Sequence, residues 1–582
     1  MIKTILLTSL AIATADDGTS KPNAPQPNSK IGIVGGGLAG VYTAYRLKKL
    51  GFKDVTIFEK TNRIGGKMHT LRTGGHNLDI GTVGWSKGYN WVYRLAEELE
   101  IPLQEVNLKS ATDFLPALPT GETYGQLKAT EEGKQLLVDT VLRYEHVRND
   151  IATGSSNPES RAGTYDFFDQ TTDDQFKTLG NLTMAEWAIQ NNFGLLMNWF
   201  NFYLSVYLSG FASTVPAYYG LHWCTPTIIK DYVQTTASHV VAPHLGHGQL
   251  AEVMVQKENI RVVYNVELRV LRQRALKEQT NVSSIKNQET IRISYKTKAM
   301  DTYKIEKFNF FISAIHPSYY DKHGFPLYSQ EKDLFKEERW VANHLYVNVA
   351  NPNYENFEIL KHQELNMLTP QTLMGIGMYP KYSIVNINNR RPIYSDDFPI
   401  NIGKSYDTCE YAMKYNHNDA FPVTSSCILE KFNQAMSKSS PSGLTSESWN
   451  SEHIKDCIKI SQGWTDANTN ITTKLNYQPE DFFYQYQTEF LVRYNSDSVA
   501  EAMPRKLFEY NLKNDRNTWF VGGYTTYESI GRIVDYIELI LERTGLKEKH
   551  KGIVFDYNRW YRALMDRGVG KESVTDFSEL YQ

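Results

Sequence analysis

The sequence predicts an α/β protein that contains a Rossmann-like unit, and three observations support this. Ile31–Val34 is a short apolar strand, followed by a glycine-rich turn and by apolar residues at helical spacing as far as Leu50. A second apolar strand, Val55–Phe58, comes next. Near the carboxyl end, residues 517–521 form another apolar strand, and residues 530–541 follow as an amphipathic helix. Strands that alternate with helices indicate a parallel sheet.

Composition and charge exclude some classes of function. The chain has 582 residues, of which 41% are hydrophobic and 22% charged, as in globular proteins. Its 62 Lys and Arg residues face 65 Asp and Glu residues, so there is no basic excess for binding nucleic acid. After the first dozen residues, no apolar run reaches the roughly 18 residues that a membrane-spanning helix needs. We therefore expect a small-molecule substrate, no nucleic acid and no integral membrane segment.

The first glycine turn has the G-x-G-x-x-G pattern of dinucleotide-binding proteins. Gly35 allows the tight turn, Gly37 lets a pyrophosphate approach the N–H groups at the helix amino terminus, and Gly40 lets helix and strand pack closely. The second strand ends at Glu59, at the spacing expected for an acidic residue that accepts hydrogen bonds from an adenosine ribose. The order of strand, turn, helix, strand and acidic residue predicts a dinucleotide site.

The residues after Glu59 indicate which dinucleotide binds. Residues 63–66, Arg-Ile-Gly-Gly, resemble the R-x-G-G signature of the flavin amine oxidase superfamily, which closes over the pyrophosphate of FAD. Residues 79–84 are similar to the D-x-G stretch that runs beside the isoalloxazine in that superfamily. The passage from Gly248 to Val266 resembles the family segment whose final valine contacts adenine through its backbone. The resemblance implies non-covalently bound FAD in a Rossmann-like domain of the amine oxidase type, with an interleaved α+β substrate domain.

The closing segment, residues 517–536, is similar to the family's last strand–glycine–helix motif, whose helix amino terminus faces the N1–C2=O edge of the flavin. Most relatives have Glu or Asp after the first glycine, where this chain has Gly523. The contact to the ribityl chain must then come from backbone, water or a neighbour such as Tyr524. The cofactor-binding residues that the resemblance implies are Gly35, Gly37, Leu38, Ala39, Gly40, Glu59, Lys60, Arg63, Gly65, Gly66, Lys67, Gly81, Thr82, Val266, Gly522, Gly523 and Ile530.

The FAD-binding domain is predicted in three pieces, residues 30–109, 241–325 and 505–545, and the substrate domain in two, residues 110–240 and 326–504. The remaining segments are a signal peptide over 1–15, a linker over 16–29 and a helical tail over 546–582. Lys3, an apolar stretch and the A-x-A pattern ending at Ala15 predict secretion with cleavage after Ala15.

In an oxidising compartment, the four cysteines allow two disulfides in three possible pairings; they are Cys224, Cys409, Cys427 and Cys457. Sequons at Asn181, Asn281 and Asn470 allow N-glycans. His244 and His247 have no third ligand nearby in sequence, so we interpret them as structural and predict no metal.

The substrate segments contain an apolar, aromatic run at 193–208, which forms either a buried helix or the wall of an apolar tunnel. Residues 58–70, 210–221 and 517–536 resemble the polyenoic fatty acid isomerases of the same superfamily. That resemblance implies hydride transfer to flavin N5 and back to another carbon of a polyunsaturated chain. Between residues 105 and 125, Lys109 is the only cation for a fatty acid carboxylate.

Two alternatives remain open: a secreted amine or L-amino-acid oxidase that produces hydrogen peroxide, and a non-catalytic FAD-binding scaffold. No catalytic residue is assigned from the sequence.

Overall fold

The computed structural model describes most of the chain between residues 22 and 547. The described residues are 22–73, 76–79, 82, 85, 89–109, 122–153, 171–206, 212, 215–226, 228–229, 237–274, 289–317, 327–335, 338–349, 373–379, 382–387, 392–394, 482–513, 516–526 and 528–547. The predicted signal peptide, Cys409, Cys427, Cys457, Asn281, Asn470 and residues 548–582 of the predicted tail lie outside them.

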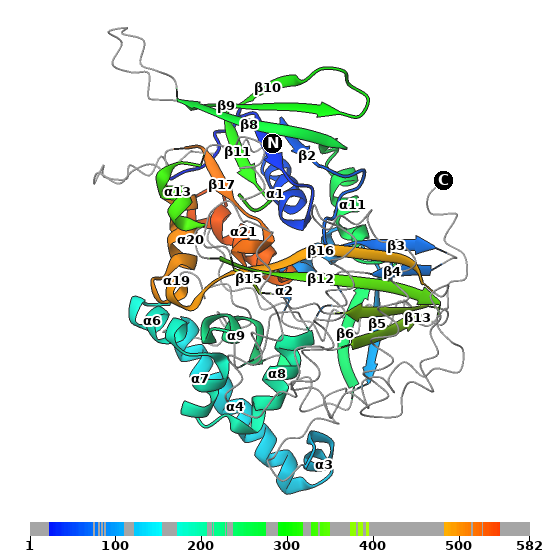
Figure 1. Ribbon diagram of the computed structural model, residues 1–582, viewed down its shortest axis with the longest axis vertical. Coiled ribbons are helices and arrows are strands. Elements are labelled where there is room, and N and C mark those ends of the chain that lie inside the picture. Colours follow the sequence, from blue (N-terminus) through cyan, green and yellow to red (C-terminus); the bar gives the residue numbers. More distant parts are fainter. Residues whose placement is uncertain are drawn as a thin grey trace, which may run out of the picture.

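A five-stranded parallel sheet joins parts of the chain that are far apart in sequence (Figure 1). Its strand order is β17-β11-β1-β2-β7, and its strands are β1 (Ile31–Val34), β2 (Val55–Phe58), β7 (Arg261–Val263), β11 (Phe310–Ser313) and β17 (Thr518–Phe520). Neighbouring strands pair in parallel throughout. Four of the five strands are fully buried, which explains why they read as continuous apolar runs.

Helices pack around this sheet and against one another. α1 (Leu38–Lys49) contacts both α11 (Gly248–Lys257) and α21 (Ile530–Arg543), and α2 (Asn90–Glu98) also contacts α21. Glu538 of α21 is fully buried. Its carboxylate has partners there, because Tyr42 donates to it at 2.6 Å and Arg46 of α1 pairs with it at 2.6 Å. Lys547 also pairs with Glu538. The carboxyl-terminal helix is thus tied to the amino-terminal Rossmann unit by a buried charge that has its partners.

An antiparallel sheet of three strands stands next to the Rossmann unit. It consists of β8 (Val266–Arg274), β9 (Glu289–Thr297) and β10 (Lys304–Phe308), and Figure 1 shows it at one end of the molecule. Glu306 of β10 accepts from both guanidinium nitrogens of Arg261 in β7, at 2.8 and 3.0 Å, and from Tyr295 of β9 at 2.7 Å. This network joins the small sheet to the edge of the parallel sheet.

A group of helices occupies the opposite end of the molecule (Figure 1). They are α3 (Tyr124–Lys128), α4 (Glu131–Thr153), α6 (Asp173–Asn181), α7 (Met184–Gln190), α8 (Met197–Val206) and α9 (Ala217–Trp223). Thr172 and Thr183 begin α6 and α7 with capping boxes, which satisfy N–H groups at the helix start. Tyr144 of α4 lies in the core of this group, with Trp187, Phe193 and Phe200 around its ring.

The remaining elements connect these parts. A second antiparallel sheet contains β12 (Glu338–Val349), β13 (Leu373–Tyr379), β14 (Tyr382–Ile387), β15 (Pro392–Tyr394) and β16 (Phe482–Tyr494). Two further antiparallel pairs join β3 (Thr70–Thr73) to β4 (His76–Asp79) and β5 (Leu103–Lys109) to the distant β6 (Ala237–Pro243). The short helices α13 (Ser329–Leu334) and α19 (Ser496–Ala500) and the longer α20 (Met503–Lys513) complete the described elements outside the 3-10 turns.

Residues 22–29, predicted as a linker without a core, are packed on the protein instead. Asn23 is 5% exposed and donates to the carbonyls of Asn511 and Thr518 at 2.8 and 3.0 Å. Trp519 donates its indole N–H to the carbonyl of Asn23 at 2.8 Å. The Pro- and Asn-rich composition therefore does not reveal that this segment is docked on the protein. An asparagine amide can hydrogen-bond buried backbone groups without an apolar side chain.

Cys224 is a buried free thiol, so the structure shows no disulfide through this residue. Burial raises the pKa of this thiol well above its usual value. With Cys224 unpaired, two disulfides cannot form, and a single disulfide among Cys409, Cys427 and Cys457 stays a prediction. Asn181, the sequon asparagine within the described residues, is exposed at the end of α6.

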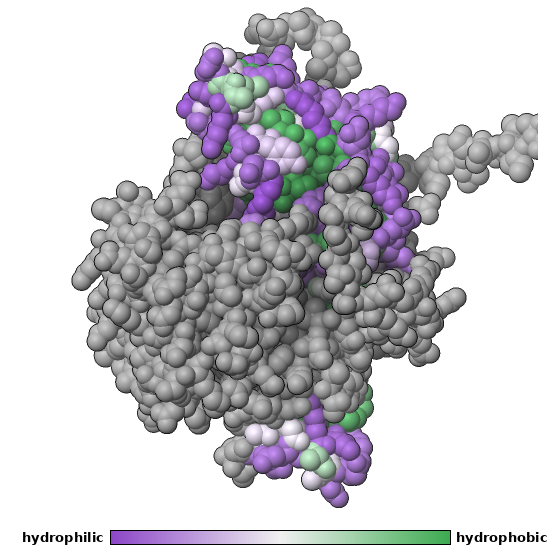
Figure 2. Space-filling view, turned by 90° about the vertical axis from the view of Figure 1, so that its right-hand side faces the viewer, coloured by the Kyte–Doolittle hydropathy of each residue, from purple (hydrophilic) through white to green (hydrophobic). Residues whose placement is uncertain are grey.

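Among the residues that the structure describes, no helix is both long and apolar enough to span a bilayer. Figure 2 shows one face on which the described residues are mainly hydrophilic.

Candidate cofactor-binding site

The candidate site lies at one edge of the parallel sheet, where the strands end. β1, β2, β11 and β17 end within a few residues of Gly35, Glu59, Ala314 and Gly522 respectively. The chain passes from β1 to β2 on one side, whereas β11 and β17 lie on the other side of β1. Ligands of open α/β sheets bind at such a switch point, outside the carboxyl ends of the strands.

The three glycines of the first turn have different surroundings. Gly35 has a φ of +102°, which a side chain disfavours. A Cβ on Gly40 would lie 2.0 Å from the carbonyl oxygen of Gly35, so helix α1 needs glycine there to approach β1. A Cβ on Gly37 would meet only the Cα of Gly66, at 3.9 Å. Space in front of Gly37, at the amino terminus of α1, is therefore open to a ligand, as the predicted pyrophosphate position requires. Leu38 and Ala39, the first residues of α1, are buried.

The second glycine turn faces the first. Gly65 and Gly66 have φ values of +97° and +56°, and a Cβ on Gly66 would lie 2.8 Å from the Cα of Gly37. The N–H of Gly65 donates to the carbonyl of Gly36 at 2.8 Å, and Arg63 donates to the carbonyl of Gly66 at 2.8 Å. The structure thus brings the G-x-G-x-x-G and R-x-G-G segments together, with no side chain between their glycines.

Glu59 stands at the end of β2 and is 9% exposed. One carboxylate oxygen accepts from the N–H of Gly36 at 2.7 Å, and the other accepts from the N–H and hydroxyl of Thr61, both at 2.8 Å. A carboxylate has about four acceptor positions, so capacity for a ribose hydroxyl remains. The neighbouring Lys60 is exposed.

Val266 begins β8 and is buried at 5% exposure. Its N–H donates to the carbonyl of Glu59 at 3.1 Å. A backbone contact from Val266 to adenine would therefore have to use its carbonyl oxygen, because its N–H already has an acceptor.

The closing segment brings Gly522 and Gly523 to the same edge. The N–H of Val521 donates to the carbonyl of Ser313 at 2.9 Å, which places the end of β17 beside the end of β11. Gly523 starts a 3-10 turn that leads to α21, whose first residue, Ile530, is buried. The Tyr524 hydroxyl donates to the carbonyl of Ser313 at 3.3 Å, and its ring packs edge-on against His316. The Tyr524 side chain is thus held by contacts within the fold. The side chain that lies beside Gly523 is that of Glu528.

Gly81 lies outside the described residues, and Thr82 is half-buried. Asp79, which opens the same stretch, is almost fully buried, and it accepts from Thr70 at 2.6 Å and from the N–H of His247 at 2.8 Å. Nδ1 of His247 lies 2.6 Å from the other carboxylate oxygen of Asp79. His247 is therefore held by a carboxylate.

Among the described residues, no group of three potential metal ligands includes His244 or His247. Sequence reasoning missed the partnership of His247 with Asp79, because the two are 168 positions apart. Burial lowers the pKa of His244.

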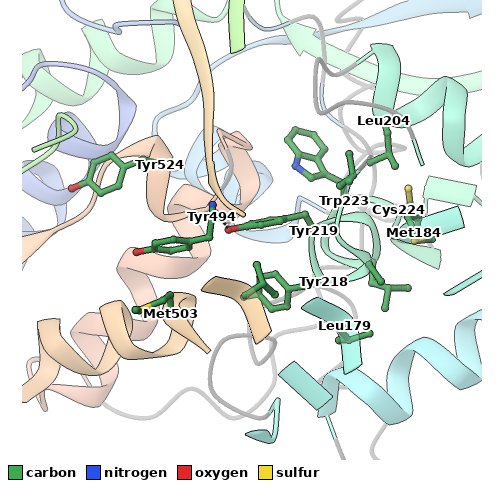
Figure 3. Packing of buried hydrophobic residues seen from close by; sticks show 14 of the residues in the cluster. Leu179, Met184, Leu204, Tyr218, Tyr219, Trp223, Cys224, Tyr494, Met503 and Tyr524 are labelled. Carbon is green, nitrogen blue, oxygen red and sulfur yellow. Dashed lines mark hydrogen bonds between the residues drawn. The ribbon is translucent and has the colours of Figure 1, made fainter. Parts of the chain in front are cut away.

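The aromatic run at 193–208 folds into a short 3-10 helix, Gly194–Leu196, and α8, with Ser209–Phe211 outside the described residues. Trp199 and Tyr203 of α8 are buried and stacked, with ring centroids 4.9 Å apart. Figure 3 shows Tyr218, Tyr219 and Trp223 of α9 close to Tyr494 of β16. The backbone N–H of Tyr494 donates to the Tyr219 hydroxyl at 3.1 Å. The described part of the run is a packed apolar core at the junction of the helices with the sheet β12–β16.

Comparison with known proteins first concerns the amino-terminal segment. A family model described as an NAD(P)-binding Rossmann-like domain matches residues 33–99. The chain is 34% identical over 86 residues to polyamine oxidase 7 of Oryza sativa subsp. japonica and 33% identical over 84 residues to 1-hydroxycarotenoid 3,4-desaturase of Flavobacterium sp.. These matches cover 15% and 14% of this chain and only 16% and 17% of the relatives.

Solved structures match over almost the whole chain. A CLA-producing fatty acid isomerase from P. acnes matches with a TM-score of 0.56 and 12% identity, covering 89% of this chain and 99% of that one. A putrescine oxidase variant matches with a TM-score of 0.50 and 12% identity, covering 93% and 99%. The chain has the fold of the flavin amine oxidase superfamily. The fold, the amino-terminal relatives and the two facing glycine turns together indicate FAD as the cofactor.

The described residues fit FAD. The open space over Gly37 accepts a pyrophosphate at the amino terminus of α1, and Glu59 stands at the end of β2 with acceptor capacity left. The amino terminus of α21 follows the closing glycines and supplies positive potential at the same edge. These groups are the ones that would hold the cofactor. Bound FAD would supply a hydride acceptor, which the side chains of this site do not provide.

Proposed function

We propose that this protein is an FAD-dependent oxidoreductase-type enzyme that isomerises double bonds of a polyunsaturated fatty acid. The observation that carries the proposal is the fold match with the fatty acid isomerase, which spans nearly all of both chains. The residues of this chain that resemble polyenoic fatty acid isomerases, 58–70, 210–221 and 517–536, support it from the sequence. Bound FAD, held by the two glycine turns and Glu59, would supply an acceptor for a hydride from a carbon between two double bonds, and would return it to another carbon of the same chain.

Such a reaction requires little acid–base catalysis by protein side chains, but it requires an apolar environment around the reacting carbon. The buried aromatic residues of α8 and α9 provide largely apolar surface next to the junction with β16, where the Tyr219 hydroxyl accepts from the N–H of Tyr494. The protein's task would be to hold the acyl chain in a fixed orientation and to exclude water from the reacting carbon.

A second candidate is an amine or amino-acid oxidase, in which oxygen reoxidises the flavin. The fold match with putrescine oxidase favours it, and the chain is also similar in sequence to polyamine oxidase 7. That sequence likeness covers only 15% of this chain, so it does not separate the two candidates. The fold match with the isomerase has the higher TM-score, 0.56 against 0.50, and we therefore rank the oxidase second.

An aerobic assay separates the candidates. The flavin-loaded protein is mixed with a polyunsaturated fatty acid and, in a parallel sample, with polyamines and amino acids. Conjugated-polyene absorbance and oxygen uptake are followed together. The proposal predicts new polyene absorbance without oxygen uptake. Oxygen uptake with peroxide formation would overturn it in favour of the oxidase, and flavin-loaded protein inactive in both channels would overturn it in favour of a non-catalytic scaffold.

A further inference from the structure

A buried carboxylate occupies the place that a side chain on Gly523 would take. A Cβ built on Gly523 would lie 2.1 Å from Oε2 of Glu528 and 2.6 Å from its Cδ. The N–H of Glu528 donates to the carbonyl of Gly523 at 2.8 Å, and Glu528 has a φ of +64°. This left-handed residue turns the chain back, so that a glutamate five positions later in sequence reaches the surface of Gly523.

The same carboxylate contacts the second glycine turn. Nζ of Lys67 pairs with Oε1 of Glu528 at 2.5 Å, and the Glu528 side chain is only 9% exposed. Lys67 directly follows Gly66, which packs against Gly37 at the amino terminus of α1. Glu528 therefore stands between the closing glycines and the predicted pyrophosphate position, where the chain that joins pyrophosphate to flavin must pass.

We propose that Glu528 binds the ribityl hydroxyls of FAD, and so supplies from position 528 the carboxylate that this chain lacks at position 523. Oε1 is engaged by Lys67, whereas Oε2 lies on the Gly523 side and can accept from sugar-alcohol hydroxyls. Tyr524 does not serve this purpose, because its hydroxyl donates to the carbonyl of Ser313. The proposal rests on FAD as the cofactor, which its test examines separately.

The test compares FAD with ADP, which contains the pyrophosphate but has neither ribityl chain nor flavin. Affinities of the full-length apoprotein are measured by fluorescence titration with FAD and by competition with ADP. For Glu528→Gln we expect a rise of about tenfold or more in the Kd for FAD, since a hydrogen bond to a charged acceptor is lost. The Kd for ADP should stay within about twofold of wild type, given that the pyrophosphate turns are untouched.

A swap of positions provides the second variant. Gly523→Glu alone places two carboxylates in one volume and should lower FAD affinity. The double change Gly523→Glu with Glu528→Gly returns a single carboxylate to the site, and glycine suits the positive φ at 528. We expect the double variant to bind FAD more tightly than either Gly523→Glu or Glu528→Gly. Glu501→Gln, an exposed glutamate at the end of α19, is the matched control for loss of one charge.

Each outcome is decisive. An equal loss of FAD and ADP affinity in Glu528→Gln would overturn the ribityl contact, because it would show that Glu528 only supports the pyrophosphate turn through Lys67. An unchanged Kd for FAD in Glu528→Gln would also overturn the ribityl contact, whatever affinity the double variant shows. Wild-type apoprotein that binds ADP but not FAD would overturn the cofactor assignment itself.

Discussion

Gly37 and Gly40 belong to one turn, yet a side chain would have opposite effects at the two positions. The Gly37 backbone is extended, with a φ of −69°, and open space lies in front of it. At Gly40, the new Cβ would collide with the carbonyl of Gly35. Both glycines belong to one sequence motif. Only the structure shows that Gly37 leaves room for a ligand, whereas Gly40 allows the helix to pack against the strand.

For Gly37→Val, we expect a folded protein that no longer binds FAD, because the branched side chain fills the pyrophosphate position without a clash in the apoprotein. Flavin absorbance of the purified variant and its thermal midpoint measure the two effects. Gly194→Ala, at a position with no atom within 4 Å of the new Cβ, is the matched control. Full flavin content in Gly37→Val would show that the pyrophosphate lies elsewhere.

The placement of Glu59 and of the glycines in both turns follows from local spacing, because each lies at a strand end or in a turn next to one. Their roles in binding the cofactor stay predictions. Glu528 and the Asp79–His247 pair could not be predicted, because their contacts depend on how distant segments pack. Tyr524 was a plausible neighbour for the ribityl chain by sequence, but its hydroxyl is used by the backbone of β11.

At the scale of elements, the strands of the parallel sheet follow from their apolar runs, with one refinement. The apolar run at residues 308–314 has the pattern of one buried strand, whereas the structure ends β10 at Phe308 and begins β11 at Phe310. β10 pairs antiparallel with β9, and β11 pairs parallel with β1. Periodicity alone does not reveal this change of sheet, because both strands bury aromatic residues.

Glu306 on β10 gives a prediction for the junction of the two sheets. Hydrogen bonds from Arg261 and Tyr295 hold the pKa of Glu306 well below its usual value of 4.5. A depressed pKa contributes stability that is present above the unfolded value and is lost as the pH falls through the folded value. We expect Glu306→Gln to lower the free energy of unfolding at pH 7 by about 1–2 kcal/mol, allowing for the half-exposed Arg261.

Denaturant unfolding at several pH values measures this difference for Glu306→Gln. The gap between wild type and variant should narrow as the pH falls below about 4.5, where the carboxylate of the unfolded chain is protonated. Glu267→Gln, at an exposed position of β8 in the same sheet, should change stability by less than about 0.5 kcal/mol. A gap that stays constant down to strongly acidic pH would contradict the charge-based account.

At the scale of the whole molecule, the five strands of the parallel sheet come from separate parts of the chain, and helices and antiparallel strands lie between them in sequence. β1 and β2 come from the first 60 residues, β7 and β11 from the middle, and β17 from near the end. The sequence match to polyamine oxidase 7 covers 15% of this chain, whereas the fold match with the isomerase covers 89% of it. The family model matches only residues 33–99, around the first two strands of the sheet, so the comparisons indicate the cofactor more directly than the substrate.

The central claim is that FAD binds at the carboxyl edge of β1 and β2, between the two glycine turns. Titration of apoprotein with FAD, followed by protein fluorescence and by the absorbance of the protein-bound fraction, tests it most directly. The account predicts saturation at one FAD per chain, with ADP competing for the same site. Apoprotein that keeps its thermal midpoint in FAD and retains no flavin after gel filtration would contradict it.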